Sequence, residues 1–250
     1  MLTKVMGKGM NGAPDREIVS YGYDPLGRRI SKTIGGQITR YVYEGMHLVA
    51  EVAPNNAIQV EYLYGNSIDN PIAMVSLRGA GGDEAIYYYH KDGLGSTAAL
   101  TDKNGAVVER YKYGPYGEPE ITDANGVLLE ESALGNNHLY TGQIYDPETG
   151  FYYYKARYYS PTLGRFLQRD PLGYVDGSNL YAYVNNNPLN WIDPLGLDKQ
   201  FAQIKVETWK PDIQQKSENT LFHLWNTTGV SPWMENTRCL PAVGEARKKE

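Results

Sequence analysis

Few side chains in this sequence have the type and spacing of a metal site or a nucleophilic centre. The 250 residues include one cysteine, Cys239, and four histidines, His47, His90, His138 and His223. The histidines are isolated from one another, without the short spacings of zinc ligands, so we interpret them as surface or packing residues. A free structural thiol at Cys239 is a simpler interpretation than a nucleophile activated by His223. We therefore expect no metal and no cofactor.

One aspartate-containing tetrapeptide, Asp-Pro-Leu-Gly, occurs three times, beginning at Asp24, Asp170 and Asp193. Proline at its second position and glycine at its fourth suit a type I turn, so the motif alone favours a structural turn. If the fold brings two of these aspartates together, their carboxyl groups could also act in acid–base catalysis. One can then act as a base on water while the other, kept protonated by its neighbour, polarises a peptide carbonyl.

Tyrosines dominate the part of the chain that must position these aspartates. All 22 tyrosines lie between Tyr21 and Tyr183, and they recur as Tyr-x-Tyr pairs. The first five pairs are spaced like the units of a repeat architecture and begin at Tyr21, Tyr41, Tyr62, Tyr87 and Tyr111. In a strand, residues i and i+2 point to the same face, so each pair places two rings on one side of a sheet. Gly35-Gly36 and the Asn-Gly steps at Asn104 and Asn125 supply hairpin turns. The pattern predicts an all-β, antiparallel array of hairpins.

Residue usage changes abruptly after Leu197. Residues 198–250 contain no tyrosine and 2 of the 27 glycines, but 3 of the 4 tryptophans. A segment this short is not expected to bury an ordinary core of its own. We therefore expect a boundary near Leu197, followed by a small and poorly defined tail.

Composition excludes several classes of protein. The net charge of −5 argues against extensive phosphate contacts, so we expect no nucleic-acid binding through residues 1–197. No run of 18 apolar residues predicts a membrane span. Residues 1–20 lack the apolar core of a secretory signal peptide.

The repeat resembles the tyrosine-aspartate (YD) repeats of RHS proteins. Residues 21–30 match the whole repeat pattern, and residues 90–96 and 111–118 are similar to further copies. The segment 140–197 resembles the RHS-repeat-associated core domain through motifs at residues 140–143, 146–150, 156–159, 164–166 and 179–188.

The resemblance implies a strip of β-sheet that spirals into a shell, an inward-curled core plug, and a variable C-terminal toxin segment. We expect YD repeats over residues 1–110, the core domain over residues 111–197, and a toxin remnant or small cargo over residues 198–250. So few repeats cannot enclose a large cavity, so we expect a partial shell.

The resemblance also implies self-cleavage after an Asp-Pro-x-Gly-Leu motif, which residues 193–197 match in full. The supporting motif positions are Pro188, Pro194 and Gly196, and the implied cut separates Leu197 from Asp198. The implied catalytic residues are Asp170, Asp193 and Arg157. The arginine would hold one carboxylate ionised or stabilise the developing oxyanion.

For this chemistry, residues 174–190 must fold back so that the Asp170 and Asp193 carboxyl groups come within hydrogen-bonding or one-water reach. Arg157 should lie beside them and the Leu197 carbonyl nearby. The alternative is a non-cleaving structural or surface-binding YD array. Expected partners are a longer RHS shell segment or a secretion apparatus, with an immunity protein for the tail. We expect an exported effector without a classical signal peptide, and otherwise a cytoplasmic protein.

Overall fold

The structure, a computed structural model, describes residues 1–9, 14–77, 84–175 and 177–202. All of them fall within Met1–Trp209, the first of two units into which the chain divides. Cys239, His223 and the predicted tail beyond residue 202 lie outside the described residues.

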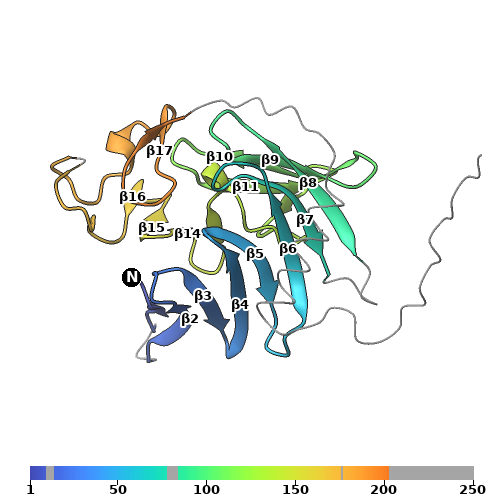
Figure 1. The fold of residues 1–250 in the computed structure, drawn as a ribbon, viewed down its shortest axis with the longest axis horizontal. Helices are drawn as coiled ribbons and strands as arrows, with labels where there is room; N and C mark the ends of the chain where they lie inside the picture. The colour runs from blue at the N-terminus through green and yellow to red at the C-terminus, as the bar shows by residue number, and fades with distance from the viewer. Residues whose placement is uncertain (10–13, 78–83, 176, 203–250) are drawn as a thin grey trace, which may run out of the picture. The chain divides into compact units, whose positions relative to one another are not determined.

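Among the described residues, nearly all of the regular secondary structure is β-strand, with two short 3-10 helices besides, which confirms the fold class (Figure 1). The first twelve strands are β1 (Lys4–Gly7), β2 (Arg16–Tyr23), β3 (Arg29–Ile34), β4 (Gln37–Glu44), β5 (His47–Val52), β6 (Ile58–Tyr64), β7 (Pro71–Ser76), β8 (Ala85–Lys91), β9 (Thr97–Thr101), β10 (Val107–Tyr113), β11 (Pro119–Asp123) and β12 (Leu128–Leu129). The remaining elements are the 3-10 helices η1 (Tyr140–Gly142) and η2 (Val184–Asn186) and the strands β13 (Ile144–Asp146), β14 (Phe151–Tyr154), β15 (Arg157–Ser160), β16 (Arg165–Phe166), β17 (Trp191–Ile192) and β18 (Gln200–Phe201).

Strands β1 to β12 form one long antiparallel sheet in which each strand pairs with its neighbours in the sequence. Strands β13 to β16 form a second sheet, and β17 pairs with β18. The expected division at residue 110 falls inside β10, whereas the change from the long sheet to the second sheet lies between Leu129 and Ile144. Because each strand of the long sheet pairs with its neighbours in the sequence, the connections between its strands are local, as the hairpin signals in the sequence predict.

The first Asp-Pro-Leu-Gly copy forms the turn between β2 and β3. The Gly27 N–H donates to the Asp24 carbonyl oxygen over 2.9 Å, and Gly27 has a φ of 81°. The Asp24 carboxylate accepts hydrogen bonds from the N–H groups of Leu26 and Arg28. These hydrogen bonds confirm the predicted turn. Glycine suits its fourth position because this residue enters the left-handed region at little steric cost.

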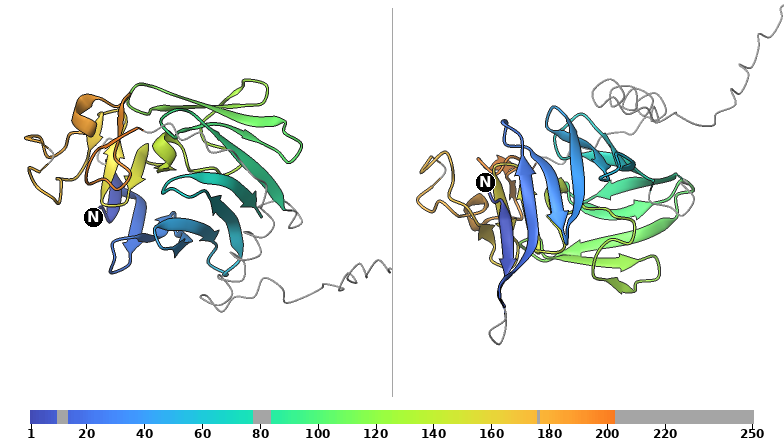
Figure 2. Two further views of the ribbon diagram at one scale, coloured as in Figure 1. Left: turned by 45° about the horizontal axis from the view of Figure 1, so that its top comes forward. Right: turned by 90° about the horizontal axis from the view of Figure 1, so that it is seen from below.

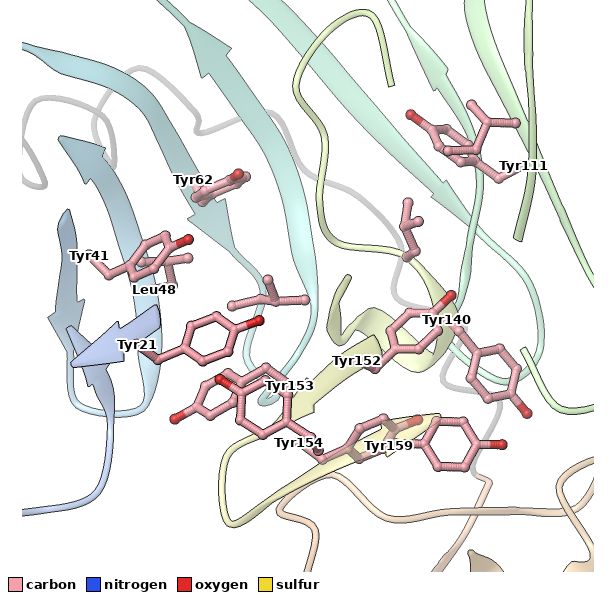
Figure 3. Packing of buried hydrophobic residues seen from close by; sticks show 14 of the residues in the cluster. Tyr21, Tyr41, Leu48, Tyr62, Tyr111, Tyr140, Tyr152, Tyr153, Tyr154 and Tyr159 are labelled. Carbon is pink, nitrogen blue, oxygen red and sulfur yellow. The ribbon is translucent and has the colours of Figure 1, made fainter. Parts of the chain in front are cut away.

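The five repeating tyrosine pairs lie in, or pack against, one buried cluster that also holds tyrosines of the second sheet (Figure 3). The rings of Tyr159 and Tyr183 have centroids 4.4 Å apart, and most neighbouring rings are tilted or edge-to-face. Buried hydroxyl groups keep partners: the Tyr152 O–H donates to the Gly117 carbonyl oxygen over 2.8 Å. Tyrosine therefore supplies both the apolar core and the polar contacts between the sheets.

A fully buried ion pair joins the two sheets. The Nη1 atom of Arg29, the first residue of β3, lies 2.5 Å from Oδ2 of Asp146, the last residue of β13, and neither side chain is exposed. Lys32 Nζ lies 3.2 Å from the other carboxylate oxygen. Burial raises the pKa of Asp146, but Arg29 and Lys32 outweigh it and hold this pKa below its ordinary value.

Aromatic rings surround the Arg29 guanidinium. Its central carbon lies 5.1 Å from the ring centroids of Tyr21 and Tyr41 and 4.8 Å from that of Tyr153. These cation–π contacts compensate part of the lost hydration, because a desolvated guanidinium is attracted to the ring faces. Figures 1 and 2 show the second sheet, in yellow, beside the blue strands that carry this arginine.

We predict that Asp146→Asn destabilises the fold by about 3–5 kcal/mol, because it leaves Arg29 charged and buried without its counter-charge. Urea unfolding measures the effect. The control is Lys112→Met, which removes an exposed ion pair with Glu120 and should cost less than about 1 kcal/mol. Equal unfolding midpoints for the two variants would contradict the prediction.

Candidate active site at the Asp193 turn

Arg157 is held in place by the strand pair on which it lies. It begins β15 directly after the tight turn from β14, in which Lys155 has a φ of 55°. Its guanidinium carbon lies 3.7 Å from the ring centroid of Phe166 in the neighbouring strand β16, and its side chain is 3% exposed. The second sheet therefore presents a buried and oriented guanidinium to the segments that follow.

Arg157 bridges the two sequence-predicted aspartates. Its Nη1 lies 3.0 Å from Oδ2 of Asp170, and its Nη2 lies 3.3 Å from Oδ2 of Asp193. Its Nε–H donates to the carbonyl oxygen of Gly196 over 2.7 Å. Because both carboxylates contact one rigid guanidinium, they lie within about 9 Å of each other. The three predicted side chains thus come together, with the arginine linking the carboxyl groups.

The segment between the aspartates folds back, as the separation of Asp170 and Asp193 in the sequence requires. The Asp170 N–H donates to the carbonyl oxygen of Leu180 over 2.9 Å, and the Phe166 N–H donates to that of Tyr181 over 2.9 Å. Tyr183 then enters the aromatic core. This anchor returns the chain to the second sheet before it reaches Asp193.

The Asp193 carboxylate shares with Asp24 a hydrogen bond from the N–H four residues later, but it also accepts one from the N–H five residues later. Asp24 and Asp170 each accept a hydrogen bond from the N–H of the leucine two residues later. The Oδ1 atom of Asp193 instead accepts from the N–H groups of Leu197, over 3.0 Å, and Asp198, over 3.3 Å. The carboxyl group therefore contacts the nitrogen of the Leu197–Asp198 peptide bond.

Burial sets the protonation of Asp193. The side chain is 3% exposed, and this burial raises the pKa of Asp193. Hydrogen bonds from backbone N–H groups and the charge of Arg157 oppose the shift without reversing it. Asp193 is therefore protonated more readily than an exposed aspartate, as the donor of a proton must be.

The supporting motif residues pack against the second sheet and its turns. Pro188 is buried, and its carbonyl oxygen accepts from the Tyr140 O–H over 3.3 Å. Gly196 has a φ of 67°, and a Cβ there would lie 2.4 Å from the Tyr154 carbonyl oxygen. Only glycine lets the backbone come this close in this conformation.

Asp69, Gln143 and Lys155 also contact this region, and our sequence analysis did not identify them. The Nε2 of Gln143 lies 3.4 Å from the Pro194 carbonyl oxygen. Lys155 forms an ion pair with Asp69, which comes from the turn between β6 and β7. Gln143 lies within a core-domain motif that could have drawn attention to it, whereas Asp69 had no such signal because its contact is purely tertiary.

Among the described residues, His138 is a packing histidine and His90 a surface histidine. His138 is buried, its Nε2 lies 3.1 Å from the Tyr64 hydroxyl, and burial lowers the pKa of His138 to about 3. His90 is exposed and pairs with Thr101. Within residues 1–9, 14–77, 84–175 and 177–202, no cluster of three metal-binding side chains occurs, and no helix is long and apolar enough to cross a bilayer.

We predict that Gly196→Ala destabilises the chain more than Gly173→Ala, the matching position of the Asp170 tetrapeptide. Both glycines have positive φ, so each alanine costs about 1–2 kcal/mol of backbone strain. A Cβ at Gly173 meets nothing within 4 Å, whereas one at Gly196 meets backbone. Thermal unfolding of both variants tests this, and equal losses would mean that the close approach at Gly196 carries no cost.

Comparison with known proteins places this chain in a family. The Teneurin YD-shell family model matches residues 7–189. The tRNA nuclease WapA of Bacillus subtilis (strain 168) is 37% identical over 201 residues, which cover 78% of this chain and 8% of that protein. Double-stranded DNA deaminase toxin A of Burkholderia cenocepacia (strain H111) is 31% identical over 235 residues, which cover 84% of this chain and 16% of that protein.

A solved structure has the same architecture. The crystal structure of TcdB2-TccC3 matches with a TM-score of 0.61 and 28% identity over 78% of this chain, which is 10% of that chain. This chain therefore spans only a small part of the relatives and of the solved structure that it matches. Because the family model covers most of the chain, the chain belongs to the Teneurin YD-shell family and is an RHS YD-repeat protein.

Proposed function

We propose that this toxin-associated YD-shell segment hydrolyses its own peptide bond between Leu197 and Asp198. The observation that carries the proposal is the contact of the Asp193 carboxyl group with the Asp198 nitrogen, while the same group pairs with Arg157. An acid with a raised pKa then contacts the atom that must gain a proton when the peptide bond breaks.

The reaction assigns a separate task to each side chain. Asp170 accepts a proton from a water molecule, whose oxygen adds to the carbonyl carbon of Leu197. Asp193 donates its proton to the Asp198 nitrogen as the carbon–nitrogen bond breaks. The products are a carboxylate at Leu197 and an amine at Asp198, and one molecule cleaves once.

Arg157 positions the reacting groups. Its Nη1 and Nη2 contact and orient both carboxyl groups, and its Nε–H holds the Gly196 carbonyl, one residue before the bond to be cut. Three contacts from one planar group fix the aspartates relative to the backbone, which is the main requirement for an intramolecular reaction. Charge on the tetrahedral intermediate also develops within reach of this guanidinium.

The family setting supports proposals about partners and location. Relatives named as a tRNA nuclease and a DNA deaminase toxin share this segment, although their named activities differ. We therefore assign the shared segment to the shell and propose that residues 198–250 belong to a variable toxin part, with an immunity protein as its partner. A longer YD-repeat segment would complete the shell, and the chain would act as part of an exported effector.

We predict that freshly purified chain contains a species ending at Leu197 and that Asp193→Asn and Asp170→Asn stay full length. Intact-mass measurement distinguishes the products. Asp24→Asn changes another copy of the tetrapeptide and should cleave like the wild type. A wild-type chain that stays full length under native conditions would refute the proposal and favour the alternative of a non-cleaving structural array.

The cleavage rate should fall as the pH rises through the raised pKa of Asp193. The rate falls because deprotonation removes the proton that Asp193 must donate. Burial raises the pKa of Asp193, so this deprotonation occurs at a higher pH than for an exposed aspartate. Refolding from urea into buffers of different pH, with the products followed by mass, measures the rate. A cleavage rate that rises as the pH passes through the pKa of Asp193 would exclude Asp193 as the proton donor.

A further inference from the structure

A second polar cluster lies on the other side of the Asp193 turn. Lys155, in the turn between β14 and β15, forms an ion pair with Asp69, and its Nζ donates to Oε1 of Gln143 over 2.8 Å. The side chains of Lys155 and Asp69 are 15% and 12% exposed, so the pair is largely withdrawn from water. We call Asp69, Gln143 and Lys155 the docking cluster.

The docking cluster contacts the backbone of the Asp193 turn. The Nε2 of Gln143 donates to Oδ2 of Asp69 over 2.7 Å and lies 3.4 Å from the carbonyl oxygen of Pro194. Pro194 directly follows Asp193, and Lys155 is two residues before Arg157. The cluster therefore touches the two segments that hold Arg157 and Asp193.

Asp69 brings the long sheet into this cluster. It lies between β6 and β7, and its carbonyl oxygen accepts from Lys91 Nζ over 2.9 Å. A Cβ on Gly142, at the end of η1, would lie 2.0 Å from that oxygen. The turn of the long sheet is thus docked on the backbone before β13, with no space for a side chain between them.

We propose that the docking cluster makes self-cleavage depend on the docking of the β6–β7 turn, with Asp69, Gln143 and Lys155 acting as positioning residues. This inference rests on the proposed function. A lysine in this buried position needs its carboxylate partner, because an unpaired buried charge is strongly unfavourable. Without Asp69, Lys155 turns toward water and displaces the hairpin turn that carries Arg157. Cleavage then waits until the long sheet has folded against the second sheet.

The docking cluster also acts on Asp193 through charge. Burial lowers the pKa of Lys155, while Asp69 and Asp193 oppose that shift, so the lysine and Asp193 attract each other. The groups around Asp193 are Arg157, Asp170 across the guanidinium, Tyr183 and Lys155. Removing the charge of Lys155 therefore favours protonated Asp193, which a loss of packing alone would not do.

The test compares Asp69→Asn, Lys155→Met, the double variant and Lys155→Arg with the exposed control Lys112→Met. Asp69→Asn and Lys155→Met should each cleave at least about tenfold more slowly, because a small displacement of the reacting groups is costly. Lys155→Met should also move the fall in rate to higher pH. Lys155→Arg should retain most of the rate, because it keeps the charge.

The double variant separates positioning from stability. Replacing both partners by neutral groups should restore much of the urea midpoint lost in the single variants, while cleavage stays slow and the pH shift remains. A double variant with wild-type rate and pH dependence would overturn the inference.

Amide hydrogen exchange separates a failure of this inference from a failure of the proposed function. In an Asp170→Asn background, which should remain intact, Lys155→Met should accelerate exchange at the Leu197 and Asp198 N–H groups, and Lys112→Met should not. If the wild type never cleaves, the proposed function fails, but this measurement still decides whether the docking cluster positions the Leu197–Asp198 segment. Unchanged exchange at both amides would then refute the role of the docking cluster.

Discussion

The contact on which the structure most depends is the buried pair of Arg29 and Asp146. The Arg29 side chain also donates to the Tyr158 hydroxyl over 3.3 Å, and its backbone N–H donates to the Tyr153 hydroxyl over 3.0 Å. Tyr153 and Tyr158 belong to β14 and β15, on either side of the hairpin turn before Arg157. Burying either charge of the pair without the other is strongly unfavourable, so the pair favours the state in which the two sheets are packed together. That requirement fixes where the proposed site forms.

Two arginines that lie against aromatic rings each join separate parts of this fold. Arg29 joins the long sheet to the second sheet, and Arg157 joins the second sheet to the two aspartates. Rings near each guanidinium supply cation–π attraction in place of water. The many tyrosines therefore do more than fill space, because they provide an apolar core in which ionised groups are tolerated and oriented.

The aspartate carboxylates of identical tetrapeptides make different contacts because the surroundings of the tetrapeptides differ. At Asp24 the carboxylate caps its own turn and pairs with Arg28, four residues away. At Asp193, Gly196 lies against the Tyr154 carbonyl, and Arg157 takes one carboxylate oxygen while the other contacts the N–H groups of Leu197 and Asp198. Local turn chemistry is common to these copies, but at Asp193 the neighbours Arg157 and Tyr154 come from the strands of the second sheet.

The sequence by itself determined the local features of this protein. The Tyr-x-Tyr pairs and the glycine turns predict antiparallel hairpins because side-chain alternation and turn geometry depend on neighbouring residues. The resemblance pointed to Arg157, Asp170 and Asp193, and the proposed chemistry required residues 174–190 to fold back. Only the tertiary structure decided that Arg157 links the two carboxyl groups, that Asp146 pairs with Arg29, and that Asp69 reaches Lys155. Those contacts join residues far apart in the chain, and burial, which no local pattern encodes, determines which charges must find each other.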